Sequence, residues 1–417
     1  MSTDPDTQLR LHDGEPLRVV ISSYGSGGDS APLITLARHM HGHGDRVRLL
    51  LERDGADRAR GLGLDAEPLA GDLRSARRRA KGDPTLQPGF RNIAEWARQT
   101  RRAAEDADVV VGSGLGAQAS QVAARATGRP FVGVTMFPIV PTSAFGSPLA
   151  LLPVPSALNR PTHALIQHLL WGAFGRALRP VYRGWGMSPL PLRFDDHPTL
   201  CAVSPALLAE PEDWPASARV VGDLAARVGH GSADTPGAPS DRLSPDLLSF
   251  LDAGPAPVYV GFGSMAVPDA GRIRDAVLGL SSDRRVIFSP GWSGIDMPSG
   301  PNLHVVGHAP HDALFPKMAV VVHHGGAGTL HAAARAGVPQ VIVPMGGDQS
   351  WWAGRAHAAG IAAAPVRVRG LDAQGLRRAV IEALARTSRA RDVAVEMASE
   401  DGCDAVDRAV HAAVCGG

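Results

Sequence analysis

Short apolar runs alternate with longer stretches of mixed polarity along most of the chain. The runs are apolar at successive positions, which is typical of strands covered by helices on both faces of a parallel sheet. In the first half we expect strands at residues 18–24, 46–52, 109–114, 130–135, 199–204 and 218–222. In the second half we expect them at residues 258–264, 284–291, 302–309, 319–326, 340–345 and 361–366. Helical stretches such as residues 29–41 and 117–127 separate the runs, so the pattern predicts an α/β protein with two Rossmann-like, doubly wound sheets.

Residues 223–245 interrupt this alternation. They are rich in Gly, Pro, Ala and Ser and lack hydrophobic periodicity, which is typical of a linker. We therefore expect an N-terminal domain at residues 1–222 and a C-terminal domain at residues 246–417, facing each other across a cleft. The pattern leaves open whether the last helical region, residues 390–413, caps the second domain or returns to the first.

The composition describes a globular protein with two cores. The chain has 417 residues, of which 44% are hydrophobic and 20% charged. Because 42 Lys and Arg face 41 Asp and Glu, the net charge is only +1, which argues against a nucleic-acid partner. The N-terminus lacks the basic and apolar regions of a signal peptide, and the three cysteines are widely spaced. These features predict a cytoplasmic protein.

One apolar stretch, residues 131–158, is long enough to cross a bilayer but contains five prolines. A continuous helix cannot form there, so we expect no stable membrane insertion. The wall of a pocket for an apolar molecule fits this stretch, and Phe137 and Phe145 are its candidate side chains. A packed loop is the alternative.

Residues 319–349 hold the pattern that says most about function. A buried strand is followed by a glycine-rich turn and a helix, and the turn consists of Gly325, Gly326, Ala327, Gly328 and Thr329. The glycines let a ligand approach the backbone, and the start of a helix presents unpaired N–H groups to an anion. Thr329 either caps the helix or donates its hydroxyl to a phosphate. The pattern predicts a phosphate-binding site.

The two histidines at the end of this strand need to be separated. Successive side chains of a strand point to opposite faces, so we expect only one of His323 and His324 to reach the ligand. Alternation alone does not say which one.

Gly347, Asp348 and Gln349 follow the next strand of the motif. Vicinal sugar hydroxyls donate and accept hydrogen bonds, so a carboxylate beside an amide is a complementary pair. An ordinary helix cap by Asp348 is the alternative.

Four further candidates follow other strands of the second sheet: Ser264, Trp292, His308 and Ala309. Ligands bind at the carboxyl ends of parallel strands in such folds. The Trp292 ring and the backbone near Ala309 have the chemistry to hold a nucleobase, although Trp292 also suits a core position.

In the first domain, the turn after the first strand contains Asp29. A carboxylate there would face the cleft, where it can take a proton from a hydroxyl. The start of the following helix stabilises the anion, which weakens it as a base. A helix cap is again the alternative.

Together these residues resemble the GT-B glycosyltransferases of the UDP-glycosyltransferase superfamily. The run HHGGAGTLHAAARAGVPQVIVPMGGDQ is similar to the donor-binding signature of that family, with APHDALFP upstream. The run GSGGDSAP is similar to its first loop, in which an Asp or His three residues before a proline is the base. The resemblance is strongest to actinobacterial enzymes that decorate natural products, including vancomycin-group, macrolide and sterol types.

The resemblance implies a role for each candidate. His323 would contact the diphosphate with Gly326, Gly328 and Thr329, assisted by Ser264, and His324 would be the less important histidine. Asp348 and Gln349 would hold the sugar hydroxyls, and His308 and Ala309 would border the base. Asp29 would deprotonate a hydroxyl of a small-molecule acceptor, with inversion at the anomeric carbon of a UDP- or dTDP-sugar.

We expect the reaction to need no cofactor and no metal, because no cluster of carboxylates or histidines in the sequence has the spacing of metal ligands. Two alternatives remain from the sequence: a nucleotide-sugar epimerase of the same architecture, and a noncatalytic partner protein.

Overall fold

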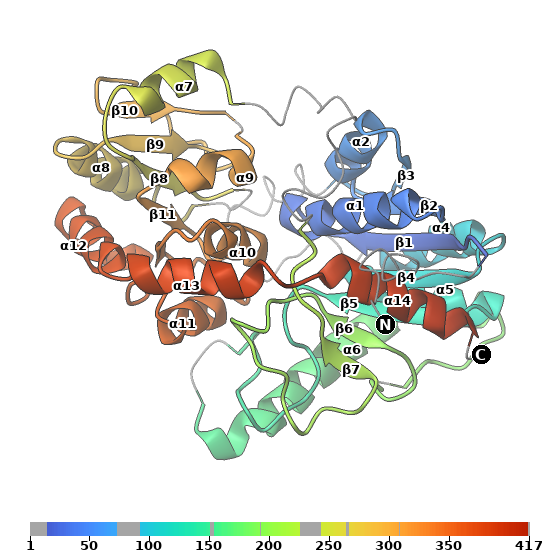
Figure 1. The fold of residues 1–417 in the computed structure, drawn as a ribbon. Helices are drawn as coiled ribbons and strands as arrows, with labels where there is room; N and C mark the ends of the chain where they lie inside the picture. Colours follow the sequence, from blue (N-terminus) through green and yellow to red (C-terminus); the bar gives the residue numbers. More distant parts are fainter. Residues whose placement is uncertain are drawn as a thin grey trace, which may run out of the picture.

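The protein contains two parallel β-sheets, each with helices on both faces (Figure 1). The computed structural model describes residues 15–72, 92–150, 154–191, 193–225, 243–263, 267–307 and 309–415. The predicted α/β class with two Rossmann-like sheets is confirmed. Most of the predicted linker lies outside the described residues, so the domain boundaries stay a prediction.

The first sheet has seven strands in the order β3-β2-β1-β4-β5-β6-β7, and each neighbouring pair is parallel. The strands are β1 (Arg18–Tyr24), β2 (Arg46–Leu51), β3 (Asp65–Pro68), β4 (Val109–Gly114), β5 (Phe131–Thr135), β6 (Thr199–Cys201) and β7 (Ala218–Val220). Val19 and Ile21 of β1 pack into one core cluster, and Val20 and Tyr24 pack into another. The alternation explains why the strand is apolar throughout, because both of its faces are covered.

Helices cover both faces of this sheet (Figure 1). The covering helices on one face are α1 (Gly27–Gly42), α2 (Arg53–Gly61) and α14 (Gly402–Cys415). Those on the other face are α4 (Ile93–Ala104), α5 (Ala117–Thr127) and the end of α6 (Asn159–Gly184). Helix α1 begins with a capping box. Ser26 is the N-cap residue, and the Asp29 carboxylate accepts the Ser26 backbone N–H.

The second sheet has five parallel strands in the order β10-β9-β8-β11-β12. They are β8 (Val258–Gly261), β9 (Val286–Ser289), β10 (Leu303–Val305), β11 (Val320–His323) and β12 (Gln340–Ile342). Helices α8 (Ala270–Ser281) and α12 (Ala373–Leu384) pack on one face. Helices α7 (Pro245–Asp252), α9 (His311–Leu314) and α10 (Ala327–Arg335) pack on the other.

The two sheets are joined by a shared apolar cluster. Val203 and Leu207, which follow β6, pack with α10, α11 (Gln349–Ala358) and α13 (Thr387–Met397) of the second half. Polar contacts flank the cluster, because the backbone N–H of Ser204 donates to Nε2 of His331 at 3.2 Å and Arg335 pairs with Asp223. The C-terminal half of α10 is therefore one place where the two halves of the chain meet.

The last helical region consists of two helices that belong to different halves. Helix α13 packs on α10, whereas α14 packs on α1, β4 and β5 of the first sheet. Figure 1 shows the red chain crossing from one half to the other between them. Helix α14 therefore belongs with the first sheet and α13 with the second.

Three details differ from the sequence expectations. Residues 361–366 form no strand and make only an isolated bridge, between Gln340 and Ala362. Strand β3 and the long helix α6 were not predicted.

None of the helices in the described part of the chain combines the length and apolar character needed to cross a membrane.

Candidate functional site

The loops that follow the strands of the second sheet meet at its carboxyl edge. The Trp292 backbone N–H, after β9, donates to the Gly263 carbonyl, after β8, at 2.8 Å. Gly291 has φ 53°, and a side chain there would collide with Gly263. Close backbone packing therefore holds half-buried Trp292 beside the loop after β8. Ser264 and His308 lie outside the described residues.

Ala309, after β10, is half-buried and packs against the core formed by α7, α10 and the second sheet. It lies at the carboxyl edge of the sheet, and its contact with a ligand stays a prediction. Its side chain, however, faces the core cluster, so only its backbone is suited to that role.

His323 is completely buried at the end of β11. Its Nε2 lies 2.8 Å from Oε1 of Gln340, and its Nδ1 accepts the Gly325 N–H at 3.1 Å. Burial lowers the pKa of His323 to about 3, so the ring stays neutral near pH 7. Both ring nitrogens are therefore engaged within the chain.

His324 occupies the more open position. It is half-buried, and its ring lies next to the backbone of Gly263 and Gly326. A side chain on Gly326 would come within 2.6 Å of His324 Nε2, so the glycine is needed for this packing. His323 therefore shapes the glycine-rich turn from a buried position, and His324 lies on its open side. Which of the two contacts a diphosphate stays a prediction.

The start of α10 is open to an anion. Gly326 is its N-cap residue and supplies no side-chain cap, and the first turn contains no acidic residue. Gly325 has φ 94°, and a side chain there would come within 2.8 Å of Ile342, so the turn requires glycine. Thr329 is the third helical residue rather than the cap, and it is half-buried. The backbone N–H groups of Ala327, Gly328 and Thr329 lie in the first turn, where helices bind anions.

Asp348 and Gln349 lie at the start of α11, directly after the turn that contains Gly347. Asp348 is the N-cap residue, yet its carboxylate accepts the Trp352 Nε1–H at 2.9 Å instead of capping the helix. Burial raises the pKa of Asp348 to about 6, and the charge of Asp29 acts in the same direction. Gln349 is buried, and its Oε1 accepts the backbone N–H of Met345 at 2.7 Å.

Asp29 lies in the first turn of α1, half-buried. Its Oδ2 accepts the Ser26 backbone N–H at 2.6 Å and the Ser26 hydroxyl at 3.2 Å. A side chain on Gly328 would come within 3.9 Å of the Gly28 carbonyl oxygen, so the starts of α1 and α10 face each other. The structure thus brings the start of α1, which contains Asp29, to the glycine-rich turn of the second sheet.

Phe137 and Phe145 are both half-buried at the apolar cluster between the sheets. The Phe145 ring lies 5.3 Å from that of Trp351 on α11 and 5.9 Å from that of His163 on α6. Packing therefore accounts for Phe145, and contact with a ligand stays a prediction for both residues.

Comparison with known proteins agrees with this geometry. Residues 292–412 match the family described as "Erythromycin biosynthesis protein CIII-like, C-terminal domain". The chain is 33% identical over 371 residues to a vancomycin aglycone glucosyltransferase of Amycolatopsis orientalis, covering 84% of this chain and 86% of that one. It is 28% identical over 430 residues to the sterol 3-beta-glucosyltransferase UGT80B1 of Arabidopsis thaliana, covering 95% and 68%.

The chain belongs to the UDP-glycosyltransferase superfamily. Its fold is similar to the solved glycosyltransferase of kitacinnamycin, with a TM-score of 0.71 at 20% identity, covering 95% of this chain and all of that one. It is also similar to VinC in complex with dTDP, with a TM-score of 0.60 at 20% identity, covering 96% and 100%. The protein is therefore a glycosyltransferase of GT-B fold.

Two supporting residues of this glycosyltransferase were missed from the sequence. Gln340 holds the ring of His323, and Trp352 holds the carboxylate of Asp348. Trp352 lies one helical turn after Asp348, so that contact was accessible from the i, i+4 spacing. Gln340 lies on a neighbouring strand, and only the strand register reveals its contact.

Proposed function

We propose that this glycosyltransferase moves a sugar from a UDP- or dTDP-sugar to a hydroxyl of a small-molecule natural product, with inversion at the anomeric carbon. The observation that carries the proposal is the meeting of two helix starts from different domains. One is the glycine-rich start of α10, and the other is the start of α1 with Asp29.

The donor diphosphate would bind at the start of α10. The first-turn N–H groups and the Thr329 hydroxyl would donate hydrogen bonds to its oxygens, and His324 would approach from the open side of the turn. As the bond from the anomeric carbon to the diphosphate oxygen breaks, negative charge grows on this leaving group. The same donors would stabilise that charge.

The sugar would lie between α10 and α11. The Trp352 indole fixes one oxygen of Asp348, and two backbone N–H groups fix the carbonyl oxygen of Gln349. With these atoms fixed, the Asp348 carboxyl group and the Gln349 amide NH₂ would bind vicinal hydroxyls.

Asp29 would act as the base. Its Oδ2 accepts hydrogen bonds from the backbone N–H and the hydroxyl of Ser26, which fix the carboxyl group at the start of α1. The acceptor hydroxyl would transfer its proton to this carboxylate while its oxygen forms the new bond to the anomeric carbon. No cofactor or metal takes part in this step as proposed.

Two features support the remaining assignments. Trp292 and the backbone at Ala309 lie at the carboxyl edge of the second sheet and are suited to the nucleobase. A solved structure of similar fold holds dTDP, which supports a nucleoside diphosphate as the donor product. Phe137 is the candidate for contact with an apolar acceptor.

The decisive experiment is Asp29→Asn. The amide oxygen can still accept the Ser26 hydrogen bonds, so the capping box is kept while the base is lost. We expect transfer to fall by at least about 100-fold, with nucleotide affinity unchanged by calorimetry. Near-normal turnover would remove Asp29 from the role of base.

A screen of UDP- and dTDP-sugars tests the donor side. Binding by calorimetry followed by mass spectrometry with natural-product acceptors identifies both substrates. Thr329→Ala should weaken nucleotide binding, and an unchanged Kd would contradict the proposed phosphate site. Incubation with donor alone should yield no epimerised sugar.

A further inference from the structure

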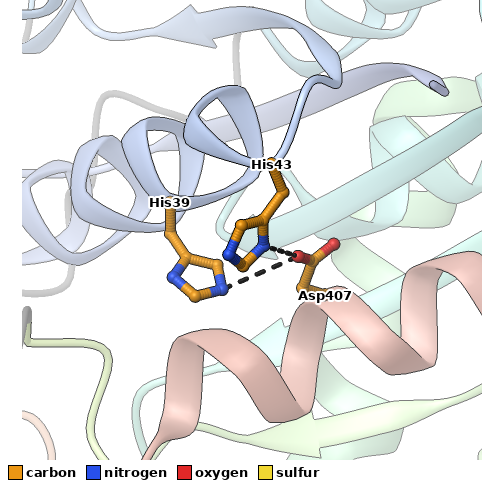
Figure 2. A group of neighbouring side chains, drawn as sticks. All are labelled: His39, His43 and Asp407. Atoms are coloured by element: carbon orange, nitrogen blue, oxygen red, sulfur yellow. Dashed lines mark hydrogen bonds and ion pairs between the residues drawn. The ribbon is translucent and has the colours of Figure 1, made fainter. Parts of the chain in front are cut away.

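A second cluster of ionisable side chains lies at the opposite end of α1. His39 and His43 of α1 face Asp407 of α14, as Figure 2 shows. Oδ2 of Asp407 lies 2.9 Å from Nδ1 of His43 and 3.6 Å from Nε2 of His39. Each helix also carries an i, i+4 pair, because His411 follows Asp407 by one turn and approaches its other oxygen at 3.5 Å.

Asp407 is the centre of this cluster and is completely buried. A carboxylate removed from water requires a nearby cation or several hydrogen-bond donors. Three imidazoles lie within 3.6 Å of its oxygens, those of His39, His43 and His411. A metal cation held between such groups would balance the charge of the carboxylate.

The chemistry and spacing suit zinc. Two imidazoles with one carboxylate form a ligand set that binds Zn²⁺ and leaves a fourth position for water. Bonds of about 2.0–2.1 Å in a tetrahedral site place ligand atoms roughly 3.3 Å apart. The 2.9 and 3.6 Å separations from the Asp407 oxygen bracket that value.

A second layer of contacts orients Asp407. Nε2 of His411 lies 3.0 Å from Oδ2 of buried Asp45, and Oδ1 of Asp45 accepts the Leu17 N–H at 2.8 Å. His411 thus links Asp407 to the start of β1. Ligating carboxylates in metal sites are supported by such outer partners.

We propose that His39, His43 and Asp407 bind one Zn²⁺ ion that fixes α14 to α1. Access is from the side of His43, whose side chain is 44% exposed. Helix α1 has 16 residues, so the ion would lie about 20 Å from Asp29, at the other end of the helix. Its role would be structural: it would hold the returning C-terminal helix on the first domain.

The sequence did not reveal this site. His43 and Asp407 are separated by 364 positions, so no local spacing joins the two pairs. The expectation that the reaction needs no metal concerns the proposed reaction centre and stays a prediction.

The test uses the full chain without a purification tag, treated with a chelator and dialysed. Calorimetric titration with Zn²⁺ should give one ion per chain, and Co²⁺ should give the visible absorption of a low-symmetry site that Zn²⁺ abolishes. His43→Gln should remove both signals. His411→Gln should weaken Zn²⁺ binding by about 10–100-fold, because it is an outer partner.

The matched control is His41→Gln, on the same helix but exposed and outside the cluster. Zn²⁺ should raise the Tm of the natural chain and of this control, but not of His43→Gln. Asp407→Asn should also lose binding. If that buried variant does not fold, Zn²⁺ binding by His43→Gln, a substitution at a half-exposed position, still tests the proposal. No binding by the natural chain, or equal binding by His43→Gln, would overturn the proposal.

Discussion

The carboxyl groups of Asp29 and Asp348 come from different domains and lie close enough for the charge of Asp29 to help raise the pKa of Asp348. The larger cause is burial, and together they bring this pKa to about 6. The Trp352 indole opposes the shift by donating to the carboxylate. The proposed base and a proposed sugar ligand therefore form one electrostatic unit across the domain boundary.

Asp348→Asn tests how far the ionised, buried Asp348 carboxylate lowers the free energy of unfolding. The unfolded chain ionises Asp348 near its ordinary pKa, so the natural protein loses stability from this group as pH rises from about 4 to 6. The amide carries no charge and can still accept the Trp352 N–H. We expect the free energy of unfolding at pH 7.5 to rise by about 1–2 kcal/mol and donor affinity to fall. Urea unfolding and calorimetry measure the two quantities.

Asp372→Asn is the control for that substitution. Asp372 caps α12 by accepting the Gly375 N–H at 2.6 Å, and it lies at an exposed position. Asparagine caps about as well, so stability and donor affinity should both stay unchanged. A fall in the stability of Asp348→Asn would contradict the assigned direction of its pKa shift.

His323→Ala should destabilise the fold. The substitution leaves the Gly325 N–H and the Gln340 amide without their partner in a buried position, at a cost of about 2–4 kcal/mol. The folded-state pKa of about 3 lies below the unfolded value, so the natural chain loses stability as pH falls below about 6.5. That part of the acid sensitivity should be absent from the variant, which urea unfolding at pH 5 and pH 7.5 would show.

His324→Ala should affect nucleotide binding more than stability. Its ring is half-buried beside Gly263 and Gly326, on the open side of the turn. We expect a small change in unfolding free energy and a clear increase in the Kd for nucleoside diphosphate. If nucleotide affinity falls in His323→Ala at full folding and not in His324→Ala, the assignment of the two histidines is wrong.

Gly328→Val and Gly325→Ala test two different reasons for a glycine in the turn. Gly328 leaves space for a ligand, whereas Gly325 is required by the backbone conformation. Among the described residues, a Cβ added at position 328 has the Gly28 carbonyl oxygen as its neighbour, at 3.9 Å, so valine should fold but fill the space between α1 and α10. We expect nucleotide affinity to drop by roughly tenfold or more. Alanine at position 325 needs φ 94° and crowds Ile342, so it should cost about 1–3 kcal/mol of stability. Thermal melts and calorimetry on both variants provide the comparison.

The order of strands and helices could be predicted because most strands are buried on both faces and are therefore continuous apolar runs. Strand β3 was not predicted because Asp65–Pro68 contains no apolar run and only Ala66 is buried, as suits an edge strand that pairs with β2. Helix α6 escaped because Gly172, Gly175 and Pro180 interrupt its pattern. The run at residues 361–366 is apolar, but burial beside β12 does not require a full strand.

Part of the candidate site could likewise be predicted from the sequence, and part could not. The glycine-rich turn, Asp348 and Asp29 were identifiable because each lies in a turn or at a helix start that comes after a predicted strand. The environment of His323 was not, because it depends on Gln340 in the neighbouring strand. The resemblance to known enzymes favours His323 as the diphosphate contact, whereas its burial favours His324, and the variants of both histidines described above test the choice.

The return of α14 to the first domain has a consequence for building hybrid enzymes. Val406 and Val410 of this helix belong to the same core as Leu33 of α1. A chimaera made with one junction in the linker would therefore pair the last helix of one parent with the first domain of another. Exchange of donor specificity between relatives needs a second junction, between α13 and α14, so that each parent keeps its own core intact.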